Sequence, residues 1–158
     1  MGQSYDPTVE AVRHAVQAPD SAIERLELAM RIINQRHPTF EWVGIYVLRG
    51  EMLELGPYVG KPTDHTEIPV GVGVCGTAVA ERADQVVDDV RKLNNYIACS
   101  PTVRSEIVVL IWDDEHDESE IIGQIDADCD EVGAFGADEE AFLHQVAALI
   151  APAVAEIR

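Results

Sequence analysis

The chain has helical periodicity at both ends and short, β-branched apolar runs between them. Apolar side chains recur every three or four positions over residues 7–17, 22–36 and 138–157, which predicts helices there. Runs typical of strands fill the middle of the chain, at residues 40–48, 52–58, 85–87, 106–112 and 120–128. Helices that flank a mostly sequential antiparallel sheet define an α+β fold.

The length of 158 residues and the hydrophobic content of 47% fit one domain with one core. We therefore assign residues 1–158 to a single domain, with N-terminal helices in residues 1–37 and the core in residues 38–158. Pro152 lies inside the last helical segment and is expected to bend that helix or end it early.

The charge balance excludes some partners. The chain has 29 acidic and 11 basic residues, for a net charge of −18, and such a surface repels nucleic-acid phosphates. The excess acid is either an ordinary solvated surface or an adaptation to high salt, which screens self-repulsion. No long apolar run and no export signal is evident, so we expect a cytoplasmic protein without a membrane partner.

Three cysteines are present, and their spacing suits neither a disulfide scaffold nor a zinc site, so no metal is expected. Cys75 lies near the start of a short helical segment, residues 75–82, where it is either an activated thiolate or a small buried residue. Cys99 lies in residues 88–103, a long segment with little periodicity, and such segments are usually functional. Cys129 ends a strand and is as consistent with an inert thiol as with a useful one.

Residues 71–76 match the glycine pattern of a dinucleotide-binding loop. The preceding residues 66–70 carry a charge and a proline, and no βαβ series follows, so the surrounding pattern does not fit that fold. We interpret these glycines as a tight turn that lets the chain pass close to another backbone.

Glu106 opens an apolar run, seven residues after Cys99, and should lie at the end of the sheet. This arrangement could hold a nucleophile and an acid/base group over one pocket. Asp126 and Asp128 are two positions apart in a strand and therefore share a face. They form either a solvated outer surface or a pair compensated by a cation such as a ligand ammonium.

Trp42 and Tyr46 share a face of the first predicted strand. Aromatic side chains in this position belong either to the core or to the wall of a pocket that holds a cation or a thioether.

Several motifs, in order along the chain, together resemble the free methionine-(R)-sulfoxide reductases, which are small standalone GAF-domain enzymes. They are Trp42-Val-Gly-Ile-Tyr46, Leu55-Gly-Pro-Tyr-Val-Gly-Lys-Pro62, Gly71-Val-Gly-Val-Cys-Gly-Thr-Ala78, Ile97-Ala-Cys99, Ser105-Glu-Ile-Val-Val109 and Gly123-Gln-Ile-Asp-Ala-Asp128. The resemblance implies a GAF-like fold and reduction of free methionine-R-sulfoxide, with no cofactor.

The resemblance also implies roles for individual residues. Cys99 would attack the sulfoxide sulfur and become a sulfenic acid, and a second cysteine would form a disulfide that thioredoxin or another dithiol reduces. Glu106, Asp126 and Asp128 would line the pocket, binding the sulfoxide oxygen and the substrate ammonium. Trp42 and Tyr46 would enclose the methyl group. We expect a homodimer.

The chain departs from the family pattern near both cysteines. The family usually has a further cysteine after Gly-Lys-Pro, but residues 62–66 contain none, and Tyr96 and Ser100 replace the usual His and Asp around Ile-Ala-Cys. Either Cys75 resolves Cys99 or an external thiol does so. Two alternatives to an enzyme stay open: a GAF module that senses a small ligand, and a dimerising scaffold built on the terminal helices.

Overall fold

The computed structural model describes residues 4–94, 101–113 and 120–158. Cys99 and its neighbours Tyr96 and Ser100 lie outside the described residues. Six strands form one sheet in the order β3-β2-β1-β6-β5-β4, and every neighbouring pair is antiparallel. The strands are β1 (Trp42–Arg49), β2 (Met52–Val59), β3 (Glu67–Pro69), β4 (Gln85–Val87), β5 (Ser105–Asp113) and β6 (Glu120–Cys129).

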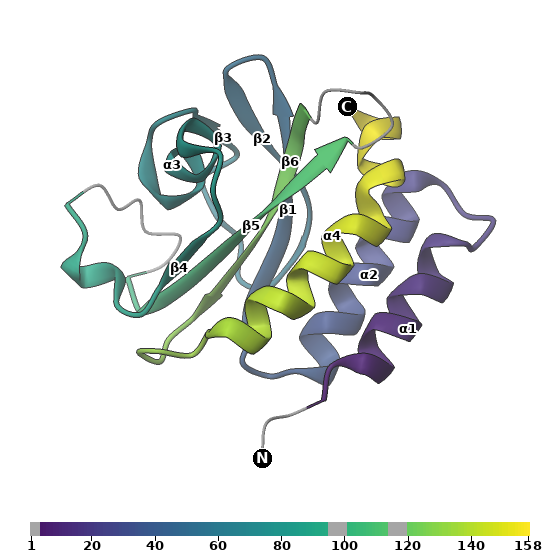
Figure 1. The fold of residues 1–158 in the computed structure, drawn as a ribbon, viewed down its shortest axis with the longest axis horizontal. Helices are drawn as coiled ribbons and strands as arrows, with labels where there is room; N and C mark the ends of the chain where they lie inside the picture. Colours follow the sequence, from purple (N-terminus) through teal and green to yellow (C-terminus); the bar gives the residue numbers. More distant parts are fainter. Residues whose placement is uncertain (1–3, 95–100, 114–119) are drawn as a thin grey trace.

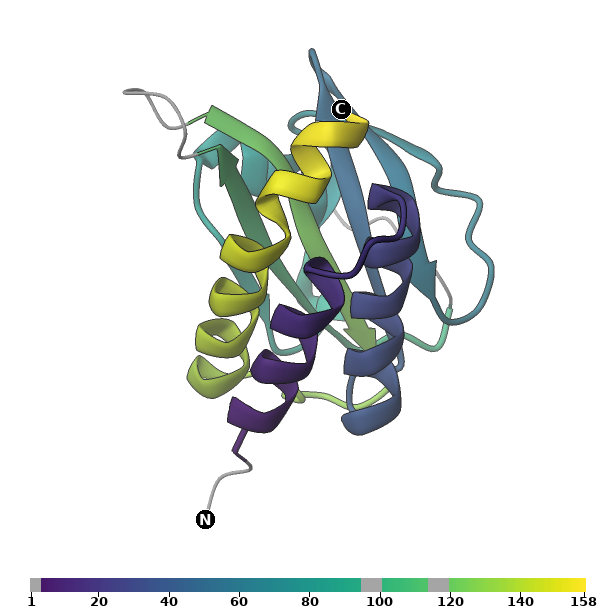
Figure 2. The same ribbon diagram turned by 90° about the vertical axis from the view of Figure 1, so that its right-hand side faces the viewer.

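Helices cover both faces of the sheet. The helices are α1 (Asp6–Val16), α2 (Ala22–Arg36), α3 (Gly73–Glu81), the 3-10 turn η1 (Val90–Lys92) and α4 (Ala137–Ile157). Figures 1 and 2 show α1, α2 and α4 side by side on one face, with α3 on the opposite face. The predicted α+β fold is therefore confirmed, with each flanking helix and five of the six strands within two residues of the predicted ends.

Strand β3 was not among the predicted strands, and of the two outcomes expected at Pro152, an early end of the helix is excluded. Pro69 argued against a buried strand, but it is compatible with β3. Strand β3 is short and lies at the edge of the sheet, where a missing backbone N–H is tolerated. Pro152 does not end α4, which continues to Ile157. Buried Ala153 and Val154 keep the last turns packed despite the lost hydrogen bond.

Helix α4 is long and apolar enough to cross a membrane by length and composition alone. Its buried side chains, which include Phe142, Leu143 and Val146, belong to the core between the three helices and the sheet. Core helices of soluble proteins have the same composition, so α4 is explained by its packing.

Alternate residues of each central strand face opposite sides. Val43, Ile45 and Val47 of β1 belong to the apolar cluster beneath the three helices, whereas Trp42 and Tyr46 belong to the smaller cluster on the α3 side. We call these two sides the helix face and the pocket face. The pleat of the strands separates the two sets of side chains.

The glycines before and inside α3 form a tight turn, as predicted. Gly71 and Gly73 have φ angles of +91° and +66°, backbone conformations that L-residues with a side chain rarely adopt. A Cβ at Gly76 would lie 2.5 Å from the backbone oxygen of Pro69. This close approach lets the start of α3 lie directly against the end of β3.

Candidate active site

Three carboxyl groups meet on the pocket face. Glu106 on β5 pairs directly with Asp128 on β6, and Asp126 lies two residues before Asp128 on the same strand face. All three are buried, with 4% or less of each residue exposed. The prediction that Asp126 and Asp128 share a face is confirmed, but that face is the interior of the protein and not a solvated surface.

Helix α3 brings a thiol to these carboxyl groups. Cys75 is in its first turn, as predicted, and its Sγ lies 3.9 Å from Oε2 of Glu106. Sγ of Cys75 and one carboxyl oxygen each of Glu106 and Asp126 all lie within 4.8 Å of one another. The side-chain amide of Gln124 donates a hydrogen bond of 3.0 Å to the backbone oxygen of Cys75, which fixes α3 to β6.

Burial controls the protonation of this cluster. It raises the pKa of Asp126 above its ordinary value, although nearby Glu106 and Cys75 partly favour the charged form. Neither oxygen of Asp126 makes a well-aligned hydrogen bond to another described residue. The raised pKa favours the protonated form of Asp126, and a protonated carboxyl can act as an acid.

Trp42 and Tyr46 both anchor the segment between β2 and β3. Trp42 stacks on Tyr58, with ring centroids 5.3 Å apart, and its Nε1 donates to the backbone oxygen of Lys61 at 3.1 Å. Tyr46 is fully buried, and its hydroxyl donates to the backbone oxygen of His65 at 2.9 Å. Both side chains therefore hold the segment between β2 and β3, and Trp42 also lines a pocket.

We call the cavity over the cysteine the inner pocket. Its lining residues are His65, Ile68, Val72, Gly73, Val74, Cys75, Glu106 and Asp126, and its volume is about 10 Å³. This is room for about one water molecule. Val72, one of the residues that line it, is 37% exposed to solvent.

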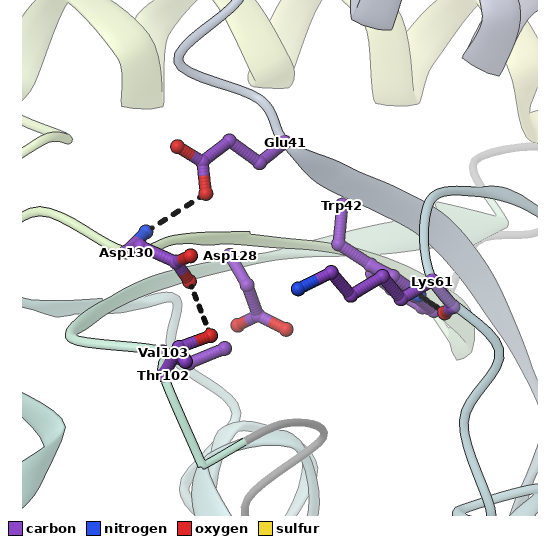
Figure 3. Close-up of a pocket in the computed structure, with 7 residues that line it drawn as sticks. All are labelled: Glu41, Trp42, Lys61, Thr102, Val103, Asp128 and Asp130. Atoms are coloured by element: carbon purple, nitrogen blue, oxygen red, sulfur yellow. Dashed lines mark hydrogen bonds between the residues drawn. The ribbon is translucent and has the colours of Figure 1, made fainter.

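A second cavity, the outer pocket, lies beside it at the ends of β1 and β6. It has a volume of about 70 Å³ and is lined by Glu41, Trp42, Lys61, Thr102, Val103, Asp128 and Asp130. Figure 3 shows the amine of Lys61 and the carboxylate of Asp128 directed toward each other across this pocket. Asp130 is held by a hydrogen bond from its backbone N–H to Glu41, at 3.0 Å.

Sequence reasoning did not select four titratable residues that line these pockets: Glu41, Lys61, His65 and Asp130. The motif Leu55–Pro62 contains Lys61, and this motif was the sequence feature that could have pointed to Lys61. The other three come from loops, whose positions depend on strand ends that lie far apart in the sequence.

Cys129, the other cysteine in the described residues, lies in an environment that disfavours reaction. Cys129 is 2% exposed at the end of β6, and its Sγ lies 3.7 Å from Oε1 of Glu41. Burial and the nearby carboxylate raise the pKa of the Cys129 thiol, so the nucleophilic thiolate is disfavoured. Of the two cysteines in the described residues, Cys75 is the one placed for chemistry.

Fold and site together match a known class. The family model for the GAF domain matches residues 1–154. The free methionine-R-sulfoxide reductase of Escherichia coli K12 is 38% identical over 117 residues, which cover 74% of this chain and 68% of that protein.

Solved structures agree with this. The type II free methionine-R-sulfoxide reductase of Thermoplasma acidophilum superposes with a TM-score of 0.77 at 36% identity, over 94% of this chain and 96% of that one. The free methionine-R-sulfoxide reductase of Neisseria meningitidis, in complex with its substrate, superposes with a TM-score of 0.87 at 28% identity. The match covers 98% of this chain and 93% of that one. The chain therefore belongs to the free methionine-R-sulfoxide reductase family of GAF-domain oxidoreductases.

Proposed function

We propose that this protein reduces free methionine-R-sulfoxide to methionine with electrons supplied by its cysteines. The observation that carries the proposal is the buried cluster of Cys75, Glu106 and Asp126 on the pocket face. Reduction of a sulfoxide by a thiol needs a nucleophilic sulfur and an acid that protonates the departing oxygen. Both kinds of group are concentrated here.

The reaction proceeds through two covalent steps. The thiolate of Cys99 attacks the substrate sulfur, the oxygen is transferred to Cys99 as a sulfenic acid, and methionine is released. The thiol of Cys75 then attacks the sulfenic sulfur, forming a Cys75–Cys99 disulfide and releasing water. Thioredoxin or another dithiol returns both cysteines to thiols and is itself oxidised to a disulfide.

The acid in the first step is the Glu106–Asp126 pair. Two carboxyl groups this close do not both ionise readily, so the pair retains a proton. That proton goes to the sulfoxide oxygen as the sulfur–oxygen bond breaks. The raised pKa of Asp126 supports this role.

The outer pocket suits the charged end of a free amino acid. Asp128 pairs with the substrate ammonium, Lys61 with the substrate carboxylate, and Trp42 packs on the side chain. A methionine sulfoxide within a polypeptide lacks both charges, so this pairing selects the free amino acid. The cytoplasmic location and the homodimer stay predictions.

One observation favours a second candidate function, a GAF module that senses a small amino acid. The segment from Pro62 to Thr66 lacks the cysteine usual in the family, and His65 from this segment lines the inner pocket. A sensor would bind the same ligand in the same pockets without turning it over.

A stereochemical assay tests the proposal. Purified protein is incubated with free methionine-R-sulfoxide and dithiothreitol or thioredoxin, and methionine is quantified by chromatography. We expect methionine from the R epimer, little from the S epimer, and none from Cys99→Ser. Binding without methionine formation would favour the sensor, and full activity of Cys99→Ser would remove Cys99 from the mechanism.

Cys75→Ser separates the two thiol roles. If Cys75 resolves Cys99, this variant still releases one methionine per chain in the absence of reductant, and mass spectrometry after trapping finds the sulfenic acid on Cys99. Loss of that first turnover would instead make Cys75 the attacking thiol.

A further inference from the structure

The thiol and carboxyl groups that the proposed reaction uses in the inner pocket also form a set of donor atoms that suits a metal ion. A thiol and two carboxyl groups come from three separate elements, Cys75 from α3, Glu106 from β5 and Asp126 from β6. Because these residues lie far apart in the sequence, no local spacing pattern predicted that they form a cluster. All three residues are buried, and their donor atoms lie within 4.8 Å of one another.

The separations are close to those around a tetrahedral zinc ion. Bond lengths of about 2.3 Å to sulfur and 2.0 Å to oxygen place the two donors about 3.5 Å apart. Sγ of Cys75 and Oε2 of Glu106 are 3.9 Å apart, so a few tenths of an ångström of side-chain movement brings this pair to that separation. A water molecule can complete the coordination shell, because the inner pocket has room for about one.

Asp126 supplies independent support for a cation. It is fully buried, and neither of its oxygens makes a well-aligned hydrogen bond to a described residue. The described residues that line the inner pocket include neither lysine nor arginine. A buried carboxyl without such a partner is costly in its charged form, and a divalent ion beside it removes that cost.

The donor types favour one class of ion. Calcium takes six to eight oxygen ligands and magnesium prefers an octahedral shell that keeps its waters. A thiolate with two carboxylates is a mixed soft and hard set, which suits zinc and similar divalent transition metals. The small volume of the inner pocket also favours an ion that is stripped of most of its water.

We propose that Cys75, Glu106 and Asp126 bind one Zn²⁺ ion, which blocks the pocket against the sulfoxide substrate. Binding releases to solvent the thiol proton of Cys75 and the proton that the Glu106–Asp126 pair retains. It forms one sulfur–zinc bond and one oxygen–zinc bond to each carboxylate, with no change of oxidation state. The competition with substrate rests on the proposed function, whereas the binding of zinc does not. Zinc would thereby switch off both the acid pair and Cys75 at once.

A second group of possible ligands provides the internal control. Asp84, Glu140 and His144 also place their donor atoms within 4.8 Å of one another, at the surface beside α4. His144 already pairs with Asp84 at 2.5 Å, and Asp84 accepts a hydrogen bond from the backbone N–H of Leu110 at 2.9 Å. These donors lie partly or largely exposed to solvent, whereas all three donors of the inner pocket are buried, so we assign zinc to the inner pocket and use His144→Ala as the matched variant.

The test is direct metal titration of the full-length protein, kept reduced without thiol reagents. Zn²⁺ affinity is measured by competition with a chromogenic chelator, and Co²⁺ is used as a spectroscopic probe. We expect one Zn²⁺ per chain, and a thiolate-to-cobalt charge-transfer band in the near ultraviolet. Cys75→Ser and Asp126→Asn should each weaken Zn²⁺ binding by about 100-fold or more, since loss of an outer-shell partner alone costs about 10- to 100-fold.

The outcomes separate the zinc site from the proposed function. Cys75→Ser should also lose the cobalt band, while His144→Ala keeps both the band and the affinity. Unchanged zinc affinity in Cys75→Ser and Asp126→Asn, or its loss in His144→Ala, overturns the proposal. Free methionine-R-sulfoxide should displace the bound Zn²⁺. Retained zinc that the sulfoxide does not displace would leave the metal site standing and refute the competition.

Discussion

The two faces of the sheet carry opposite chemistry on the same strands. On β6, Ile125 and Ala127 pack beneath the three helices, while their neighbours Asp126 and Asp128 lie on the pocket face. The helix face has a buried polar pair, Thr8 and His37, and this pair is joined by a hydrogen bond of 2.6 Å. The helix face thus follows the rules of a stable core except at Nδ1 of His37, which makes no hydrogen bond to the described residues. The pocket face departs from them further, because it buries three carboxyl groups.

This contrast indicates that the two faces of the sheet have different functions. Burial of a carboxyl group lowers the stability of a fold, so three buried carboxyl groups on one face need a functional reason. We infer that the helix face stabilises the protein and that the pocket face performs its chemistry. Substitutions on the two faces should therefore separate stability from activity.

The largest effect is expected for Glu106→Gln on the pocket face. This change keeps the shape of the side chain but removes one member of the acid pair, so proton delivery to the sulfoxide fails. General acid catalysis contributes about 10²- to 10⁴-fold, and we expect kcat to fall by that factor. Steady-state kinetics with free methionine-R-sulfoxide measure it, and a kcat within about twofold of wild type would exclude Glu106 from the acid role.

Ile125→Ala on the helix face should act on stability instead. Ile125 is fully buried in the core beneath the helices. Loss of its side chain should reduce the free energy of unfolding by about 2–5 kcal/mol, because a cavity remains. Urea denaturation measures the change. The kcat of the folded fraction should stay close to that of wild type; a large loss of kcat would show that the faces are coupled.

Asp126→Asn should change how stability depends on pH. Burial raises the pKa of Asp126 above its ordinary 3.8, so the folded state retains a proton that the unfolded state loses as the pH rises. Asp126 therefore destabilises the fold increasingly as the pH rises above 3.8, and this penalty is absent in more acidic solution. The variant lacks this titration.

We accordingly expect Asp126→Asn to be more stable relative to wild type at pH 7 than at pH 4, as measured by the difference in unfolding free energy between variant and wild type. Parallel urea denaturation series at the two pH values provide the comparison. A difference of the opposite sign would mean that the folded state stabilises the charged carboxylate.

Tyr46→Phe should have the smallest effect. It removes the hydrogen bond from the Tyr46 hydroxyl to the backbone of His65 and leaves the ring in place. We expect a loss of about 0.5–1.5 kcal/mol in unfolding free energy. A modest rise in KM should accompany it, because the segment that carries Lys61 and His65 is less firmly held. An unchanged stability would show that water replaces the lost hydroxyl at no cost.

The sequence predicted most of the fold because local patterns determine most of it. Period-two alternation placed Asp126 with Asp128, and Trp42 with Tyr46, on common faces before any packing was known. The meeting of Cys75 with Glu106 had no such local signal, since it depends on how α3 docks. That docking comes from the close contact at Gly76 and the hydrogen bond from Gln124.

The outer pocket was harder to predict for a related reason. Glu41, Lys61 and Asp130 lie just outside strand ends, and loop positions carry no periodicity. Tyr46 was correctly placed on the pocket face, but its complete burial and its hydrogen bond to the loop depend on the path of residues 60–66.

The most direct test of the account measures kcat/KM and unfolding free energy on the same preparation of Asp126→Asn. The account predicts that kcat/KM for free methionine-R-sulfoxide falls by about 10²-fold or more. It also predicts that the stability of this variant at neutral pH equals or exceeds that of wild type. Retained activity, or a loss of stability as large as that of Ile125→Ala, would contradict the separation of the two faces.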